Sequence, residues 1–173
     1  MRRGHLLSAF LADTGGAAGV ELALILPAML ALMFTCMEGG IYVYSEHQVI
    51  KGVRDGARYA GRQSFSNISC TQSPSSALTT TIRNVTVYGK VSPTANDKPR
   101  ISTWTVPDTA NQSYTTVSVS CASTSTGIYT VLGNAPVVTV SAKVQYPALF
   151  SQITGIPLTI YLGSSDQAAV MGV

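Results

Sequence analysis

The stretch TGGAAGVELALILPAML, residues 14–30, decides the fold, because small residues lead there into a long apolar run with one carboxylate, Glu21, at its entrance. In residues 22–43 the only acidic or basic side chain is that of Glu38. These 22 positions make a helix of roughly 33 Å, which matches the hydrocarbon core of a bilayer, about 30 Å thick. The run therefore predicts a membrane-spanning helix, which Pro27 is expected to kink or open locally.

The helical pattern continues beyond the apolar run. Val49, Val53, Ala57 and Ala60 recur at helical spacing, which predicts one helix from about residue 20 to residue 63. Four basic residues lie on other faces of this segment: Lys51, Arg54, Arg58 and Arg62. They are typical of a solvated or membrane-surface face. The interleaved aromatic side chains of single-strand nucleic-acid binders are missing, so nucleic acid is not an expected partner.

The chain after residue 63 is rich in Ser, Thr, Val and Asn. Alternating apolar and polar residues predict strands at residues 101–106, 114–121, 137–146 and 158–163. A short helix is expected from Ser75, and residues 90–100 read as a polar loop. The fold class is therefore expected to be α+β, with a long N-terminal transmembrane and amphipathic helix packed on a small antiparallel sheet.

The chain has three cysteines. Cys36 lies in the apolar run, where an inert thiol is expected. Cys70 and Cys121 lie in the polar part and are natural disulfide partners if that part is outside the cytoplasm, although either can also pair with another chain. Closing a loop of about 50 residues would contribute roughly 4 kcal/mol in the chain-entropy model.

Basic residues flank the apolar run on both sides, so charge alone does not orient it. Arg2 and Arg3 resemble the start of a secretory signal, but the run is longer than the apolar core of about 7–15 residues in such signals. A lipoprotein signal would use Cys36, and Thr35 before it is larger than such signals accept. The disulfide interpretation places the C-terminal part in an oxidising compartment and the N-terminus in the cytoplasm.

The sequence holds no recognisable catalytic constellation. His5 and His47 fall on opposite sides of the predicted membrane span. No His/Cys cluster has metal-ligand spacing, and no glycine-rich phosphate loop follows a strand. An enzyme, a resident metal and a cofactor are therefore not expected.

The entrance to the apolar run resembles a prepilin-type processing site, in which a small residue is followed five positions later by a glutamate and a long apolar helix. Here those residues are Gly16 and Glu21, with Leu22 where an aromatic residue often stands. The wider run, with VELALILP at residues 20–27 and VRDGARYAG at residues 53–61, looks like the TadE-like family of minor pilins or pseudopilins from tight-adherence pilus systems. The last 35 residues are similar to the ends of these proteins.

The resemblance implies cleavage between Gly16 and Ala17, which would make Glu21 the fifth residue of the mature chain. It implies three parts: a leader at residues 1–16, a transmembrane and amphipathic helix at residues 17–63, and a periplasmic α+β domain at residues 64–173. The new ammonium group of Ala17 would pair with the carboxylate of Glu21, within the filament across two subunits.

The same resemblance implies a location and a set of partners. The protein would be a single-pass protein of a bacterial inner membrane, with a cytoplasmic N-terminus, and would be required for assembly of a tight-adherence pilus that can incorporate it. The implied partners are the prepilin peptidase, a sister pseudopilin, the major pilin and the inner-membrane assembly platform.

Two alternatives stay open at this point. The chain can remain an uncleaved single-pass anchor that carries a periplasmic ligand-binding or sensory β domain. Glu38 can be an intramembrane acid that contacts another subunit, or it can lie at the outer lipid interface, where Tyr42 and Tyr44 would form an aromatic belt.

Overall fold

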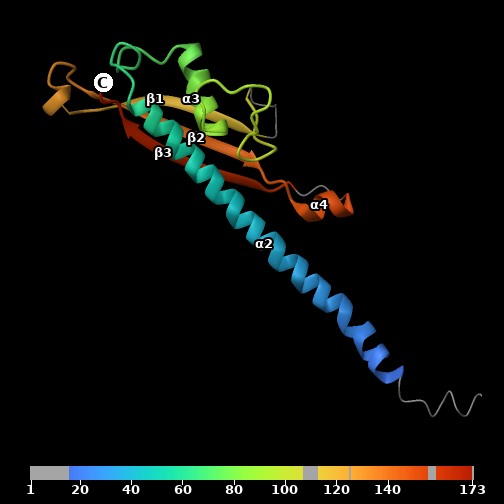
Figure 1. Ribbon diagram of the computed structural model, residues 1–173. Helices are drawn as coiled ribbons and strands as arrows, with labels where there is room; N and C mark the ends of the chain where they lie inside the picture. The colour runs from blue at the N-terminus through green and yellow to red at the C-terminus, as the bar shows by residue number, and fades with distance from the viewer. Residues whose placement is uncertain (1–15, 107–112, 125, 156–158, 173) are drawn as a thin grey trace, which may run out of the picture. The chain divides into compact units, whose positions relative to one another are not determined.

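The computed structural model describes residues 16–106, 113–124, 126–155 and 159–172 (Figure 1). The chain divides into two compact units, Met1–Gly40 and Ile41–Val173, which we call the N-terminal unit and the C-terminal unit. Helix α2 (Ala17–Gly61) begins in the first and ends in the second. The C-terminal unit also contains α3 (Ser76–Tyr88), β1 (Tyr114–Ala122), the 3-10 turn η2 (Gly127–Tyr129), β2 (Ala135–Gln145), α4 (Leu149–Thr154) and β3 (Tyr161–Ala169).

The three strands form one antiparallel sheet in the order β1-β2-β3. In the register, Val140 of β2 lies opposite Val117 of β1 and Asp166 of β3. Along β2 the apolar side chains of Val138, Val140 and Val144 are fully buried. The residues between them are more exposed, so the sheet has one buried face, as the alternating sequence predicts.

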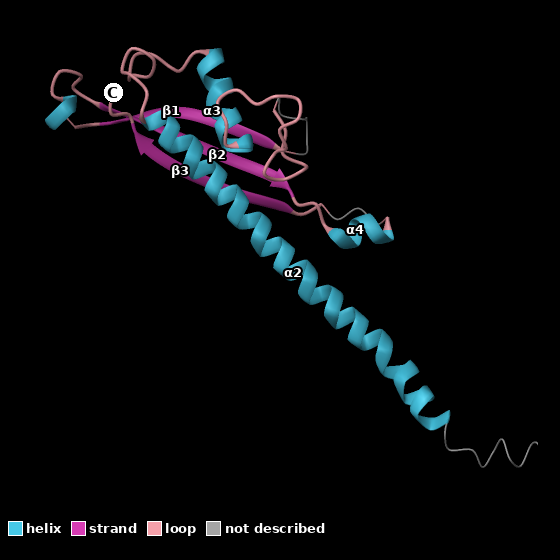
Figure 2. Ribbon diagram, viewed as in Figure 1, coloured by secondary structure: helices cyan, strands magenta, loops and turns pink. Residues whose placement is uncertain are grey.

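The second half of α2 covers the buried face of the sheet (Figure 2). Val49, Val53, Ala57 and Ala60, spaced by three or four residues, are at most 1% exposed. They share one core with the sheet and with α3. The predicted α+β fold, with a long N-terminal helix packed on a small antiparallel sheet, is therefore confirmed, with α2 at Ala17–Gly61 rather than at residues 20–63.

Helix α3 begins where the sequence predicts it. The hydroxyl oxygen of Ser75 caps the helix by accepting a hydrogen bond from the backbone N–H of Leu78, and Gly89 ends it in the left-handed conformation with φ 71°. The threonine run does not break the helix, because the hydroxyls of Thr80 and Thr81 donate to carbonyls one turn earlier. Its inner face buries Ile82 and Val85.

The strand expected at residues 101–106 is wrong. That segment forms a turn, in which the backbone N–H of Trp104 donates to the carbonyl of Ile101 at 2.9 Å. Ile101 and Trp104 are both buried, so burial repeats every three residues and not every two. The indole N–H of Trp104 donates to the hydroxyl of Thr115 at 2.9 Å, which satisfies its only polar atom inside the core.

The other strand predictions differ in their accuracy. β1 and β2 match residues 114–121 and 137–146 closely, whereas the last strand lies later than residues 158–163. β3 begins at Tyr161 and continues through Ser164, Ser165, Asp166 and Gln167. This half of β3 shows little alternation of apolar and polar residues. It is a strand because its backbone pairs with that of β2, and not because its side chains are buried.

The loop between α3 and residue 100 is held by ion pairs at both of its ends. Asp97 accepts from the ammonium group of Lys90 and from the backbone N–H and the hydroxyl of Thr94, and these contacts, that of Lys90 first, lower the pKa of Asp97 to about 2. Arg100 donates to the carboxylate of Asp55 on α2 at 2.7 Å and to the carbonyl of Thr86 at 3.1 Å. These contacts fix the loop on both α2 and α3.

Candidate functional site

The apolar half of α2 is exposed on all sides in the described structure. Large side chains around the helix, including Val20, Leu22, Leu24 and Leu32, are 60% to 75% exposed. The helix is long and apolar enough to cross a membrane, and its most apolar 18-residue window has a mean hydropathy of 2.1 and no buried residue. A helix that is apolar all round needs a nonpolar environment, so by length and composition this half of α2 is a candidate membrane anchor.

Gly16 and Ala17 lie at the start of this helix. Gly16 is exposed and directly precedes Ala17, the first residue of α2. The rest of the predicted leader, residues 1–15, lies outside the described residues. The peptide bond between Gly16 and Ala17 therefore joins a residue in 3-10 conformation to the first residue of α2.

Glu21 lies one helical turn after Ala17. Residues at positions i and i+4 of a helix share a face, so the carboxylate of Glu21 and the backbone nitrogen of Ala17 are neighbours along one side of α2. Glu21 is exposed, between Val20 and Leu22, which are 62% and 60% exposed. Within the part of the chain that the structure describes, no cation forms a salt bridge with it. An ionised acid among apolar side chains is costly in a membrane unless a cation or water compensates it.

Two roles are expected for Glu38, a contact with another subunit inside the membrane or a position at the outer lipid interface. Glu38 is partly buried, whereas Gly39 and Gly40 beside it are exposed and have open space where a side chain would be. The ring of Tyr42 packs edge-to-face against that of Tyr146 at 5.3 Å inside the C-terminal unit, and Tyr42 is partly buried. Tyr44 remains 64% exposed.

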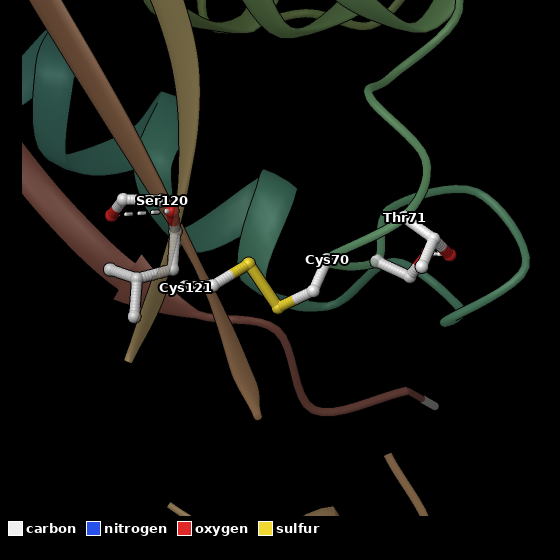
Figure 3. Close-up of a disulfide and its surroundings, with 6 residues drawn as sticks. Cys70, Thr71, Ser120 and Cys121 are labelled. Atoms are coloured by element: carbon white, nitrogen blue, oxygen red, sulfur yellow. Dashed lines mark hydrogen bonds between the residues drawn. A yellow bond between two sulfur atoms is a disulfide. The ribbon is translucent and has the colours of Figure 1, made fainter. Parts of the chain in front are cut away.

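Cys70 and Cys121 form a disulfide bond (Figure 3). The Cα atoms are 5.7 Å apart, across a sequence separation of 51 residues. The bond joins the loop after α2 to the end of β1, an edge strand of the sheet. Cys36 is a free, exposed cysteine in the apolar half of α2.

The described residues contain no group of three or more His, Cys, Asp or Glu side chains that could hold a metal ion. The arrangement that remains is an exposed apolar helix with an acid one turn from a boundary peptide bond.

The family comparison addresses this helix directly. Residues 16–58 match the family model described as TadE-like protein. Most of helix α2 is therefore similar to TadE-like proteins. The match begins at Gly16, includes Glu21 and Glu38, and ends inside the segment that packs on the sheet. No curated protein and no solved structure matches the chain.

The part of α2 that packs in the C-terminal unit contains two glycines, Gly52 and Gly56. The hydrophobic pattern of the sequence does not reveal their role. A Cβ atom on Gly52 would lie 2.5 Å from the carbonyl oxygen of Thr86, and one on Gly56 would lie 2.1 Å from the hydroxyl oxygen of Thr86. The two glycines therefore let α2 and α3 approach each other closely. The available clue was their spacing, since two glycines one turn apart weaken a helix unless packing requires them.

Proposed function

We propose that the protein is a minor pilin or pseudopilin that a prepilin peptidase cleaves between Gly16 and Ala17, and that it is required for assembly of a tight-adherence pilus. The observation that carries the proposal is the placement of Glu21 one turn inside an exposed apolar helix that begins at Ala17 and is TadE-like. The match to a TadE-like family supports association with a tight-adherence pilus system.

Cleavage supplies the missing partner of Glu21. A new ammonium group on Ala17 has an ordinary pKa near 8, so it carries a positive charge at neutral pH. The carboxylate and the ammonium group are each costly at the edge of an apolar phase, and together they offset this cost. Between neighbouring subunits the same pair fixes how far one helix enters the assembly relative to the next.

The orientation follows from the disulfide. Disulfide bonds persist in oxidising compartments, and the Cys70–Cys121 bond lies in the C-terminal unit. The C-terminal unit is then periplasmic and residues 1–16 face the cytoplasm, where the peptidase acts in this family. The partners are the prepilin peptidase, a sister pseudopilin, the major pilin and the inner-membrane assembly platform.

The intact mass of the membrane-extracted protein tests the proposal. In cells with an active prepilin peptidase, we expect a chain that begins at Ala17, and in cells without it a chain that keeps residues 1–16. Gly16→Leu should block cleavage, because the peptidase requires a small residue at that position, whereas Gly40→Leu should not. A full-length chain in the presence of active peptidase would favour the uncleaved anchor with a periplasmic ligand-binding or sensory domain.

Glu21→Ala separates processing from assembly. The variant is expected to be cleaved normally, because the scissile bond is unchanged, and to enter pili at least about tenfold less, because the ammonium group of Ala17 then lacks its partner. The measurement is the ratio of sheared-pilus to membrane-bound protein by immunoblot. Glu46→Ala, at another exposed acid on α2, is the matched control and should leave this ratio unchanged. Normal incorporation of Glu21→Ala would remove the ion pair from the mechanism.

A further inference from the structure

A row of four cations runs along the outer face of α2 in the C-terminal unit. Lys51, Arg54, Arg58 and Arg62 are all exposed, and their spacing of three, four and four residues places them on one side of the helix. We call these four residues the basic row. The buried residues of the same helix, such as Val53 and Ala57, lie on the opposite side, against the sheet.

Three other cations of the C-terminal unit have partners within it, unlike the members of the basic row. Lys90 pairs with Asp97, Arg100 pairs with Asp55, and Lys143 stacks over the ring of Tyr161 at 4.4 Å. No salt bridge or hydrogen bond joins a side chain of the basic row to another described residue. The carboxylate of Asp55, on the same helix, is bound by Arg100.

A face that only needs to be soluble does not require this pattern. Exposed helix faces usually mix charges of opposite sign at i and i+4, which stabilises the helix. Here Arg54, Arg58 and Arg62 repeat the same charge at that spacing, which destabilises it. The helix dipole favours cations only within the last turn, so it explains Arg62 and Arg58 and leaves Lys51 and Arg54 unexplained.

A hollow lies at the end of the basic row. It has a volume of about 330 Å³ and is lined by Arg58 and Gly61 of α2, by Arg62 directly after that helix, by Ala168 and Ala169 of β3, and by Met171. Met171 is 60% exposed. The hollow therefore combines an apolar wall with two guanidinium groups and suits an apolar side chain flanked by carboxylates.

We propose that the basic row and this hollow form a docking surface for an acidic segment of a different protein. The row extends over roughly 16 Å along α2, and its like charges complement a segment that carries carboxylates at the same spacing. Two copies cannot meet through this row on both sides, because the two rows repel each other. The inference does not depend on cleavage at Gly16.

The test uses the full chain in zwitterionic lipid nanodiscs and a fluorescent helical peptide with glutamates at positions i, i+3, i+7 and i+11. A peptide of the same composition in scrambled order is the reference. We expect the ordered peptide to bind more tightly than the scrambled one. Arg58→Glu/Arg62→Glu should weaken its binding at least about tenfold, and Lys98→Glu, at an exposed lysine outside the row, less than about twofold.

A second variant examines the hollow. Met171→Ala is expected to weaken a peptide that ends in leucine and to leave unchanged one that ends in serine. Unchanged Trp104 fluorescence in each variant would show that the fold is kept. Equal binding of ordered and scrambled peptides, or equal effects of Lys98→Glu and the double variant, would overturn the proposal. So would loss of peptide binding in nanodiscs of anionic lipid, which would assign the basic row to headgroups.

Discussion

Replacing Gly56 with alanine is expected to lower the free energy of unfolding of the C-terminal unit by about 2–3 kcal/mol. In an open helix the same change stabilises by up to about 1 kcal/mol. Here the new Cβ would lie 2.1 Å from the hydroxyl oxygen of Thr86, which is fully buried and donates to the carbonyl of Ile82 at 2.8 Å. Thr86 must turn away and lose that hydrogen bond, or α2 and α3 must separate.

Chemical denaturation of the detergent-solubilised full chain measures this effect. Trp104 is the only tryptophan of the sequence and is fully buried in the C-terminal unit, so its fluorescence reports the unfolding of that unit. Gly40→Ala is the matched control, because nothing lies within 4 Å of the added atom. It should leave the Trp104 transition unchanged.

A compensating substitution makes the test specific. Thr86→Ala removes the hydroxyl that the new Cβ would meet, and the next atoms, Thr86 Cβ and the carbonyl of Ile82, are 3.3 and 3.6 Å away. The double variant Gly56→Ala/Thr86→Ala should therefore be more stable than the sum of the two single effects predicts. Strictly additive effects would show that Gly56 is not held by its contact with Thr86.

Removing the disulfide is expected to cost about 4 kcal/mol, because the bond closes a loop of about 50 residues in the unfolded chain. The variant is Cys70→Ser/Cys121→Ser, and the measurement is again the Trp104 transition. A reducing agent should lower the stability of the parent chain to that of the variant and leave the variant itself unchanged.

Cys36→Ser serves as the control for the disulfide experiment. Cys36 is unpaired and lies in the apolar half of α2, so its loss should not move the Trp104 transition. If reduction of the parent chain left that transition in place, the Cys70–Cys121 bond would not contribute to the stability of the C-terminal unit.

Local patterns in the sequence predicted the elements whose own side chains carry the signal. The apolar run and the buried row from Val49 to Ala60 gave α2, and strict alternation gave β1 and β2. Ser75 gave the start of α3 through its capping chemistry. The strand predictions were wrong where contacts with distant residues decide the structure. The segment around Trp104 forms a turn because the indole is buried against Thr115 in the core. β3 continues through polar residues because its backbone pairs with β2.

The candidate site likewise has features that the sequence predicts and features that depend on packing between distant segments. The relation of Gly16, Ala17 and Glu21 is a matter of spacing along one helix, so the sequence contains all of it. The need for Gly52 and Gly56 arises from the approach of Thr86, which lies 34 and 30 residues after them and is brought there only by the packing of α3. The hollow beside Arg62 likewise requires residues from β3 and the C-terminal end of the chain.

Helix α2 runs without a break from Ala17 to Gly61, and its last third is the core of the C-terminal unit. A protease that would shed this unit therefore finds no flexible stalk, because every peptide bond from the apolar run to Gly61 is helical. A cut after the buried Ser45 would also divide the core itself. The apolar half of α2 and the buried row from Val49 to Ala60 thus belong to one helix, and a cut that spares this helix cannot separate them.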